Sequence, residues 1–214
     1  MPTLNAHQWS VLERAAEERL QGSPPAHDFT HVLRVAANAM ALARSEGADV
    51  EACRAAALLH ELFNYPKDHP DSARSGDVCA EHARALLDSI EADPAFANEV
   101  AAAIRDHAFS KGAMPESLTG RILQDADRLD AIGAIGVARC LATCSEMRRP
   151  FYAPRDPFCR ERAPDDKLWG IDHFYKKLLR IPEKLHTESA KRMAEPRAAF
   201  LRRFLDELER ELSS

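Results

Sequence analysis

The chain has 214 residues, 45% of them hydrophobic and 29% charged, so it is long enough to bury one substantial core and has the balance of a globular protein. Its net charge of -5 lacks the basic surplus of proteins that bind duplex nucleic acid, and we expect no such partner. No stretch reaches the roughly 18 apolar residues that a membrane span needs. The N-terminal residues also lack the features of a secretory signal, so we expect no membrane partner.

Five cysteines stand at positions 53, 79, 140, 144 and 159, without CxxC spacing. Cys140 and Cys144 would share one face of a helix, but no second pair or nearby histidine completes a zinc site. An odd number of scattered cysteines is typical of reduced, mostly buried thiols. This usage predicts a cytoplasmic protein.

Residue usage favours helices, because alanine, leucine, glutamate and arginine are abundant and only eight glycines occur. Apolar spacing predicts successive helices over Leu4–Leu20, Phe29–Ser45, Val50–Phe63, 72–89, 95–108, 117–131 and 133–146. Asp28 is the expected N-cap of the second helix, and Gly47 marks its expected end. Pro66 should limit the third helix, since the residue before a proline avoids the helical region.

The pattern changes after residue 147. Residues 148–166 carry four prolines and many charges, which predicts an irregular loop, either a lid or a packed segment. Helices are expected again over 167–179 and 187–212, with a kink at Pro196. Since no strand pattern occurs, we expect an all-α fold, formed as a single helical domain over residues 1–214.

Residues 57–65 read ALLHELFNY, and His60 and Glu61 stand side by side at the end of this apolar run. A metalloprotease helix would need a second histidine at position 64, and Asn64 excludes that motif. Neighbouring side chains on a helix point about 100° apart, so the pair can share a metal ion only across the helix end. Otherwise it is a core histidine beside a solvated glutamate.

Three further segments supply candidate ligands. His31 lies in the first turn of the second predicted helix, and His107 lies at the end of a later one. The segment ILQDADRLDAIGAIG is mostly apolar but carries Asp125, Asp127 and Asp130. These carboxylates either form a solvated face or are buried, and a buried carboxylate is costly unless a cation meets it. Two nitrogen and two oxygen ligand groups are then available to one divalent ion: His31, His60, Glu61 and Asp127.

The order His … His-Asp … Asp, on separate helices, is the signature of the HD-domain metal-dependent phosphohydrolase superfamily. This chain resembles it in His31, in the pair His60 and Glu61, and in Asp127. It is also similar, from about His27 to Leu205, to a bacterial branch of predicted HD hydrolases. The segments that carry this second likeness are FNYPKDHPDSARS, IRDHAFSKG, ILQDADRLDAIGAIGVAR, the DPF of APRDPFCRERAPDDK, and DHFYKKLL.

The resemblance implies an HD-type helical bundle with a metal-site core over about residues 27–146 and C-terminal helices over 167–212. It also implies one divalent metal ion. Imidazole favours transition metals and carboxylate favours harder cations, so Mn, Fe, Co, Ni and Mg ions are all candidates.

Two residues depart from the family pattern. Relatives carry Asp where this chain has Glu61, whose longer side chain reaches a cation if the metal shifts or the side chain folds back. Otherwise Glu61 marks a weaker site or a changed metal preference. Nucleotidase-type relatives carry a catalytic Glu where this chain has Asn64. An amide cannot act as a general base, so another group must activate the water.

Charge and resemblance make Lys67 and Arg128 candidates for phosphate contact. Lys67 is otherwise an exposed loop lysine, and Arg128 otherwise pairs with Asp125 or Glu61 beside the metal. His107 is a candidate general acid, a further metal ligand, or a helix-end histidine that the helix dipole favours.

Other conspicuous features have structural interpretations. Asp172 and His173 look like a second HD pair but follow the expected metal aspartate, so we interpret them as helix-start and interface residues. The glycines of AIGAIGV lack the context of a phosphate loop and should allow close helix packing. The apolar stripe of the last helix predicts packing on the core, or alternatively a dimer seam, so a monomer and a homodimer both remain open.

The resemblance therefore implies a metal-dependent phosphohydrolase that acts on a nucleotide or another small phosphate ester. The alternative is a binding module that keeps the fold and senses nucleotide and metal with little or no turnover. Glu61 and Asn64 are the residues that favour this alternative.

Overall fold

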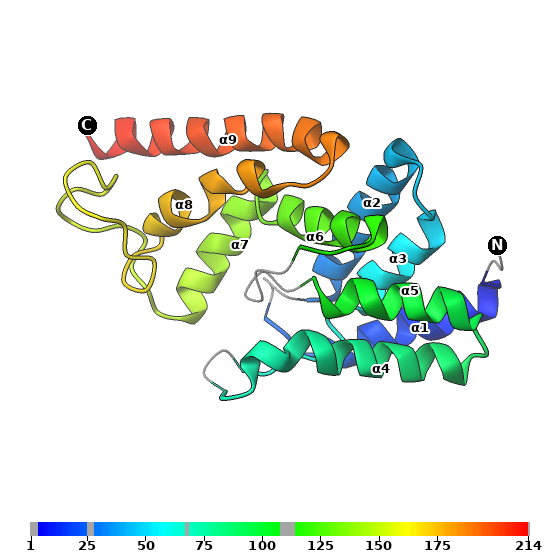
Figure 1. Ribbon diagram of the computed structural model, residues 1–214. Helices are drawn as coiled ribbons and strands as arrows, with labels where there is room; N and C mark the ends of the chain where they lie inside the picture. The colour runs from blue at the N-terminus through cyan, green and yellow to red at the C-terminus, as the bar shows by residue number, and fades with distance from the viewer. Residues whose placement is uncertain (1–3, 25–27, 67–68, 108–113, 214) are drawn as a thin grey trace. The chain divides into compact units, whose positions relative to one another are not determined.

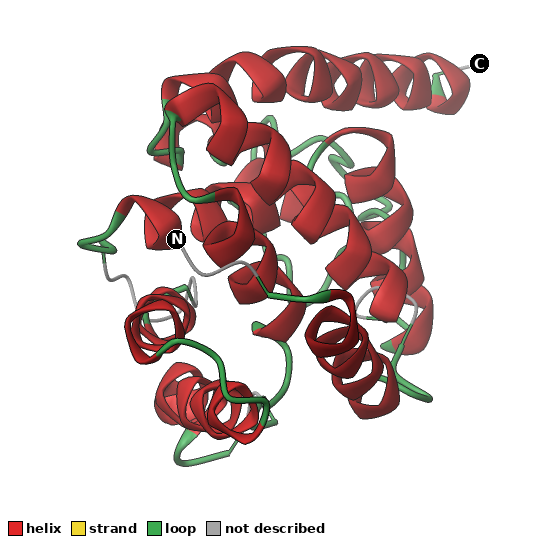
Figure 2. Cartoon of the chain, turned by 90° about the vertical axis from the view of Figure 1, so that its right-hand side faces the viewer, coloured by secondary structure: helices red, strands yellow, loops and turns green. Residues whose placement is uncertain are grey.

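The computed structural model describes residues 4–24, 28–66, 69–107 and 114–213, and within these ranges the chain forms helices and no strand, which confirms the all-α prediction (Figures 1 and 2). The α-helices are α1 (Ala6–Arg19), α2 (Phe29–Glu46), α3 (Val50–Leu59), α4 (Ser75–Ser89), α5 (Pro94–Arg105), α6 (Leu118–Asp130), α7 (Gly133–Glu146), α8 (Asp172–Lys176) and α9 (Glu188–Leu212). Short 3-10 helices are η1 (Ser72–Arg74), η3 (Leu178–Arg180) and η4 (Pro182–Lys184). The chain divides into two compact units, residues 1–127 and 128–214.

In the first unit, α3 packs against α1, α2 and α5, and α4 packs along α5. Apolar side chains that are fully buried form its core: Leu12, Val32, Val35, Leu42, Leu59, Leu87, Val100, Ile104, Ile122 and Leu123. The helices α4 and α5 approach closely at Gly76, where a Cβ atom would lie 2.5 Å from the carbonyl oxygen of Arg105. Any larger residue would push the two helices apart.

Helix boundaries agree with the sequence where a local cap sets them. Asp28 caps α2 by accepting a hydrogen bond from the His31 N–H, and Gly47 ends the same helix in the left-handed region with φ of 69°. The predicted helix over 133–146 matches α7 to the residue. The last helix, α9, continues through Pro196.

The third helix is shorter than predicted: α3 ends at Leu59, and His60 forms its C-cap. Burial raises the pKa of Cys79 to about 11, so its thiol keeps the proton. This thiol lies 3.4 Å from the Leu59 carbonyl oxygen and 3.2 Å from that of His60, and donates to them. The Leu59 carbonyl oxygen also accepts from the Leu62 N–H at 3.2 Å, so one tight turn and the Cys79 thiol of α4 together satisfy the end of the helix. The apolar pattern runs on past this point and so hides the true end.

In the second unit, α7 packs against α9. Gly133 begins α7 with φ of 77°, and a Cβ atom there would lie 3.2 Å from the Arg197 side chain of α9. At Gly136 a Cβ atom would lie 2.3 Å from the Ala131 carbonyl oxygen. The two glycines therefore serve the tight turn into α7, and Gly133 also allows the close approach of α9 that the sequence predicted.

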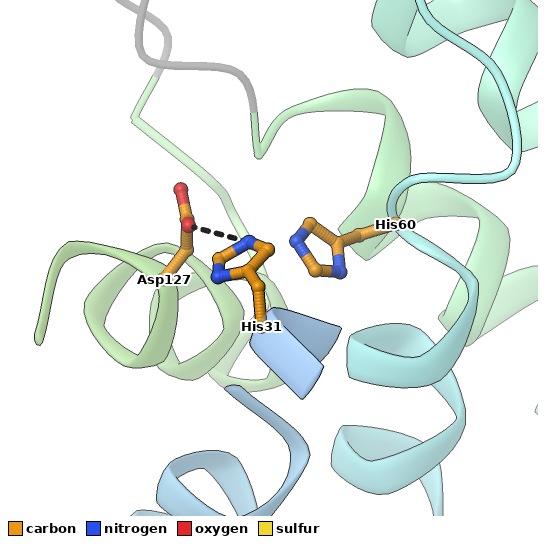
Figure 3. A group of neighbouring side chains, drawn as sticks. All are labelled: His31, His60 and Asp127. Carbon is orange, nitrogen blue, oxygen red and sulfur yellow. Dashed lines mark ion pairs between the residues drawn. The ribbon is translucent and has the colours of Figure 1, made fainter. Parts of the chain in front are cut away.

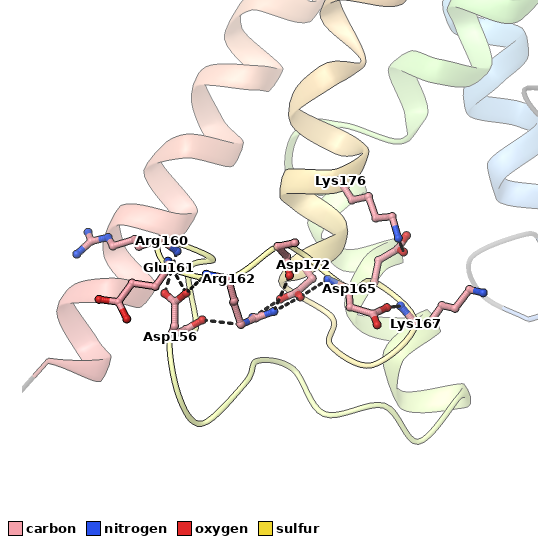
Figure 4. Close-up of polar contacts among 10 residues, drawn as sticks. Asp156, Arg160, Glu161, Arg162, Asp165, Lys167, Asp172 and Lys176 are labelled. Carbon is pink, nitrogen blue, oxygen red and sulfur yellow. Dashed lines mark hydrogen bonds and ion pairs between the residues drawn. The ribbon is translucent and has the colours of Figure 1, made fainter.

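Residues 148–166 form a packed loop (Figure 4). The Asp156 carboxylate accepts hydrogen bonds from the backbone N–H groups of residues 160, 161 and 162, at 2.9, 2.8 and 3.0 Å. The Arg162 guanidinium then donates to both carboxylate oxygens of Asp172, at 2.5 and 2.7 Å. Asp172 is fully buried and begins α8, which confirms its interpretation as a helix-start residue.

The predicted helix over 167–179 is reduced to α8 and η3. The Gly170 N–H donates to the Pro150 carbonyl oxygen at 3.0 Å, and the Ile171 N–H donates to that of Phe151 at 2.6 Å. These N–H groups are used by the loop and cannot start a helix at Lys167. Pairing with a distant segment thus overrides a helical sequence pattern.

Candidate metal centre

His31 is held in the first turn of α2 by the cap of that helix. The Asp28 carboxylate accepts a hydrogen bond from the His31 backbone N–H at 3.0 Å, and the Thr30 hydroxyl donates to the same oxygen at 2.6 Å. The His31 side chain is only 1% exposed. The cap therefore fixes where the backbone of His31 enters the core.

His60 is oriented by the end of α3. Its Nδ1 lies 2.7 Å from the Ala57 carbonyl oxygen, and a carbonyl can only accept, so Nδ1 carries the proton. The Nε2 atom of the neutral ring then keeps its lone pair, which is the arrangement that a metal-binding histidine needs. His60 is 2% exposed.

Asp127 completes a compact group with the two histidines (Figure 3). Its Oδ1 lies 3.6 Å from His31 Nε2, and one ligand atom from each of His31, His60 and Asp127 lies within 4.8 Å of the others. Asn38 lies on the same face of α2 as His31, two turns on, and its side chain donates to the Ala126 carbonyl oxygen at 3.3 Å. This contact ties α6 to α2 next to the cluster.

The donor set of this cluster fits a divalent cation. Ligand bonds to nitrogen and oxygen are about 2.0–2.2 Å long, so ligands on opposite sides of one ion are about 4 Å apart, close to the spacing seen here. Two imidazole nitrogens and a carboxylate oxygen suit transition metals and leave coordination positions for water and substrate. Asp127 is the most accessible of the three, with its side chain 34% exposed.

Glu61 adjoins this cluster without belonging to its compact group. Its Oε1 lies 4.0 Å from His60 Nε2, and its side chain is 17% exposed. The earlier end of α3 places Glu61 after the helix, as required for a residue that shares a metal with its neighbour across a helix end.

His107 extends the row of imidazoles. Its ring centroid lies 5.4 Å from that of His60, at an interplanar angle of 89°. The ring centroid of His31 lies 5.5 Å from that of His60. The Nδ1 of His107 bonds to the Ile104 carbonyl oxygen, so its Nε2 also keeps a lone pair. Desolvation lowers the pKa of His107, and the nearby imidazole of His60 lowers it further, because two imidazolium charges so close together would repel each other.

The remaining predicted residues lie in different settings. Lys67 is outside the described residues. Arg128 belongs to the second unit, where its guanidinium donates to the Lys184 carbonyl oxygen at 2.6 Å and lies 3.0 Å from His186 Nε2. Asp125 and Asp130 are buried, and Asp130 pairs with Arg139 at 2.9 Å, so these aspartates do not form a solvated face.

Sequence reasoning missed the residues that position the ligands. Cys79 holds the end of α3, and no pattern in the sequence marks it. Asn38 had a signal, because a polar residue seven positions after His31 falls on the same buried face of one helix.

Among the described helices, none combines the length and the apolar character needed to span a membrane.

The sequence and the fold are similar to those of known proteins. The model of the HD domain matches residues 28–132, which contain all three residues of the cluster. The uncharacterized protein YpgQ of Bacillus subtilis is 31% identical over 188 residues, covering 87% of this chain and 84% of that protein. The crystal structure of YpgQ in complex with ADP is similar with a TM-score of 0.75 and 29% identity, over 96% of this chain and 95% of that one. A predicted HD superfamily hydrolase from an uncultured Thermotogales bacterium is 32% identical with a TM-score of 0.65, over 96% of this chain and 93% of that one. With its His31, His60 and Asp127 cluster inside the matched region, the chain belongs to the HD-domain phosphohydrolase superfamily.

Proposed function

We propose that this protein is a metal-dependent phosphohydrolase that acts on a nucleotide or another small phosphate ester. The observation that carries the proposal is the cluster of His31, His60 and Asp127, in which three separate helical elements bring two buried imidazoles and a carboxylate together. A divalent cation bound there would lower the pKa of a water molecule and polarise a phosphoryl oxygen.

Each residue of the site has a role set by its geometry. His31 and His60 offer Nε2 atoms, Asp127 offers an oxygen, and Glu61 serves as a fourth ligand or as an acceptor for bound water. His107 presents a lone pair at Nε2, because its Nδ1 proton is held by the Ile104 carbonyl. We assign to His107 the acceptance of a proton from the attacking water, the task that Asn64 cannot perform.

The substrate assignment is supported by the molecule bound in the crystal structure of one relative. YpgQ has been crystallised with ADP, a nucleoside diphosphate, which supports a nucleotide as the substrate class here. Lys67 and Arg128 are the cations that we assign to the phosphates, on charge and resemblance to the family. A hydrogen bond to the Lys184 carbonyl oxygen holds the Arg128 guanidinium in a fixed orientation.

A screen for phosphate release tests the proposal. Nucleotides and phosphorylated metabolites are supplied with Mn²⁺, Co²⁺, Ni²⁺ or Mg²⁺ in turn, and turnover should be lost in His60→Ala. The control is His7→Ala, which removes an exposed histidine from α1.

The same screen decides on the second candidate, a nucleotide and metal sensor, which the position of Glu61 outside the compact cluster and the amide of Asn64 favour. If no substrate releases phosphate with any metal while nucleotide still raises the melting temperature, the protein is a sensor.

A further inference from the structure

Four aromatic side chains form a continuous row just after the metal-binding histidine. Tyr65 stacks on His69 with ring centroids 4.5 Å apart and an interplanar angle of 14°. Phe63 stacks on His82 at 5.5 Å and 4°, and Phe63 and Tyr65 meet edge to face at 4.7 Å. We call these rings, of Phe63, Tyr65, His69 and His82, the aromatic row.

The backbone holds the row in place. The Tyr65 N–H donates to the Ser75 hydroxyl oxygen at 3.1 Å, and that hydroxyl donates to the Ser72 carbonyl oxygen at 2.9 Å. His82 lies on α4 three positions after Cys79, the residue that holds the end of α3. The same helix therefore fixes both the metal-binding histidine and one end of the row.

The row is not part of the hydrophobic core. Phe63, Tyr65 and His69 are half-buried and His82 is exposed, although burying an aromatic ring is one of the largest single gains available to a fold. Rings that are pre-stacked yet left accessible lose little conformational freedom when a further planar group binds.

The row also lies within reach of the metal cluster. Phe63 follows His60 by three residues, so its Cα lies at most about 11 Å from that of His60. This distance is of the order that a ribose and a diphosphate bridge. A nucleotide with its phosphates at the cluster is thus long enough for its base to reach Phe63, at the near end of the row.

We propose that the aromatic row is the binding site for the nucleobase of a nucleoside phosphate, with Tyr65 as the main stacking ring. The proposal rests on the proposed function for the location of the phosphates, but it concerns binding and does not require turnover. It assigns to the row the choice of a nucleotide over a phosphate compound without a base.

A matched pair of ligands tests this assignment on the full-length protein with Mn²⁺. The α,β-methylene analogue of ADP and methylenediphosphonate share the same bridged phosphonate and differ by the nucleoside. Calorimetry should show that Tyr65→Ala weakens binding of the ADP analogue by about tenfold or more, the size of one base–aromatic stack. Binding of methylenediphosphonate should not change.

Two further variants separate stacking from other roles. Tyr65→Phe keeps the ring and should bind the ADP analogue like the wild type, whereas a loss equal to that of Tyr65→Ala would assign the effect to the hydroxyl and overturn the proposal. Trp9→Ala removes a half-exposed ring that contacts Arg54 on α3, and should leave both affinities unchanged.

Equal weakening of both ligands in Tyr65→Ala, or no weakening of either, would also overturn the proposal. A protein that releases no phosphate but shows the selective loss would keep the base site and lose the hydrolase function, so the two failures are distinguishable.

Discussion

His60 shows how the surroundings of a single residue can prepare it to bind a metal ion. The order of His31, the His60 and Glu61 pair, and Asp127 in the sequence was enough to select the candidates, because the family signature is read from residue types. It could not reveal that the Ala57 carbonyl sets the tautomer of His60, since this bond exists only where α3 ends. Nor could it show that Asp127 is closer to the histidines than Glu61 is.

Replacing the two carboxylates by amides compares their roles as ligands. Asp127→Asn should lower Mn²⁺ affinity by more than about 100-fold, because it removes a charged oxygen from the compact cluster. Glu61→Gln should lower it by about tenfold, the lower end of the range for groups that support a ligand. Titration calorimetry measures both. The reverse order would make Glu61 the principal carboxylate ligand.

Among the elements, helix ends set by local caps were predictable and those set by distant partners were not. Asp28 and Gly47 mark the two ends of α2 as expected, because these signals lie directly beside the helix in the sequence. The end of α3 differs from expectation because the Cys79 thiol bonds to a carbonyl there. The start of α8 differs because the carbonyls of Pro150 and Phe151 accept hydrogen bonds from the residues just before this helix. Long-range contacts of this kind leave no periodic pattern.

The cap of α2 should matter for stability and for the metal site together. Asp28→Ala should lower the free energy of unfolding by about 1 kcal/mol and also weaken Mn²⁺ binding, because it frees the backbone at His31. Asn5→Ala removes the cap of α1 and should lower the free energy of unfolding by a similar amount without weakening Mn²⁺ binding. Urea denaturation and metal titration measure the two effects. Equal metal affinity in both variants would contradict a positioning role for this cap.

The ion pair that holds the packed loop should make stability depend on pH. Burial acts to raise the pKa of Asp172, but the hydrogen bonds from Arg162 and the Asp165 N–H hold that pKa below its ordinary value of 3.8. A depressed pKa means that the stabilisation is complete above about pH 3.8 and is lost as pH falls through the folded-state value.

Asp172→Asn should therefore lower the free energy of unfolding by about 3 kcal/mol near pH 6. The difference in melting temperature between wild type and variant should shrink below pH 4. A difference that stays constant down to pH 2 would show that the charge on Asp172 contributes nothing.

For the whole molecule, the composition was sufficient to predict the all-α class, and the motif signature was sufficient to predict the superfamily. The convergence of three helical elements on one cluster could be predicted only through the family resemblance, because residues 31, 60 and 127 are far apart in the chain and the packing of α2, α3 and α6 joins them. The aromatic row was not predicted, because its rings also come together only in the folded chain. Phe63 and Tyr65 lie two positions apart in sequence, but His82 joins them only through α4.

The central claim is that His31, His60 and Asp127 hold one divalent cation, and equilibrium dialysis against Mn²⁺ tests it most directly. The wild type and His7→Ala should each bind one ion per chain, and His60→Ala should bind none at the same free Mn²⁺ concentration. Equal binding by His60→Ala and the wild type would contradict the account.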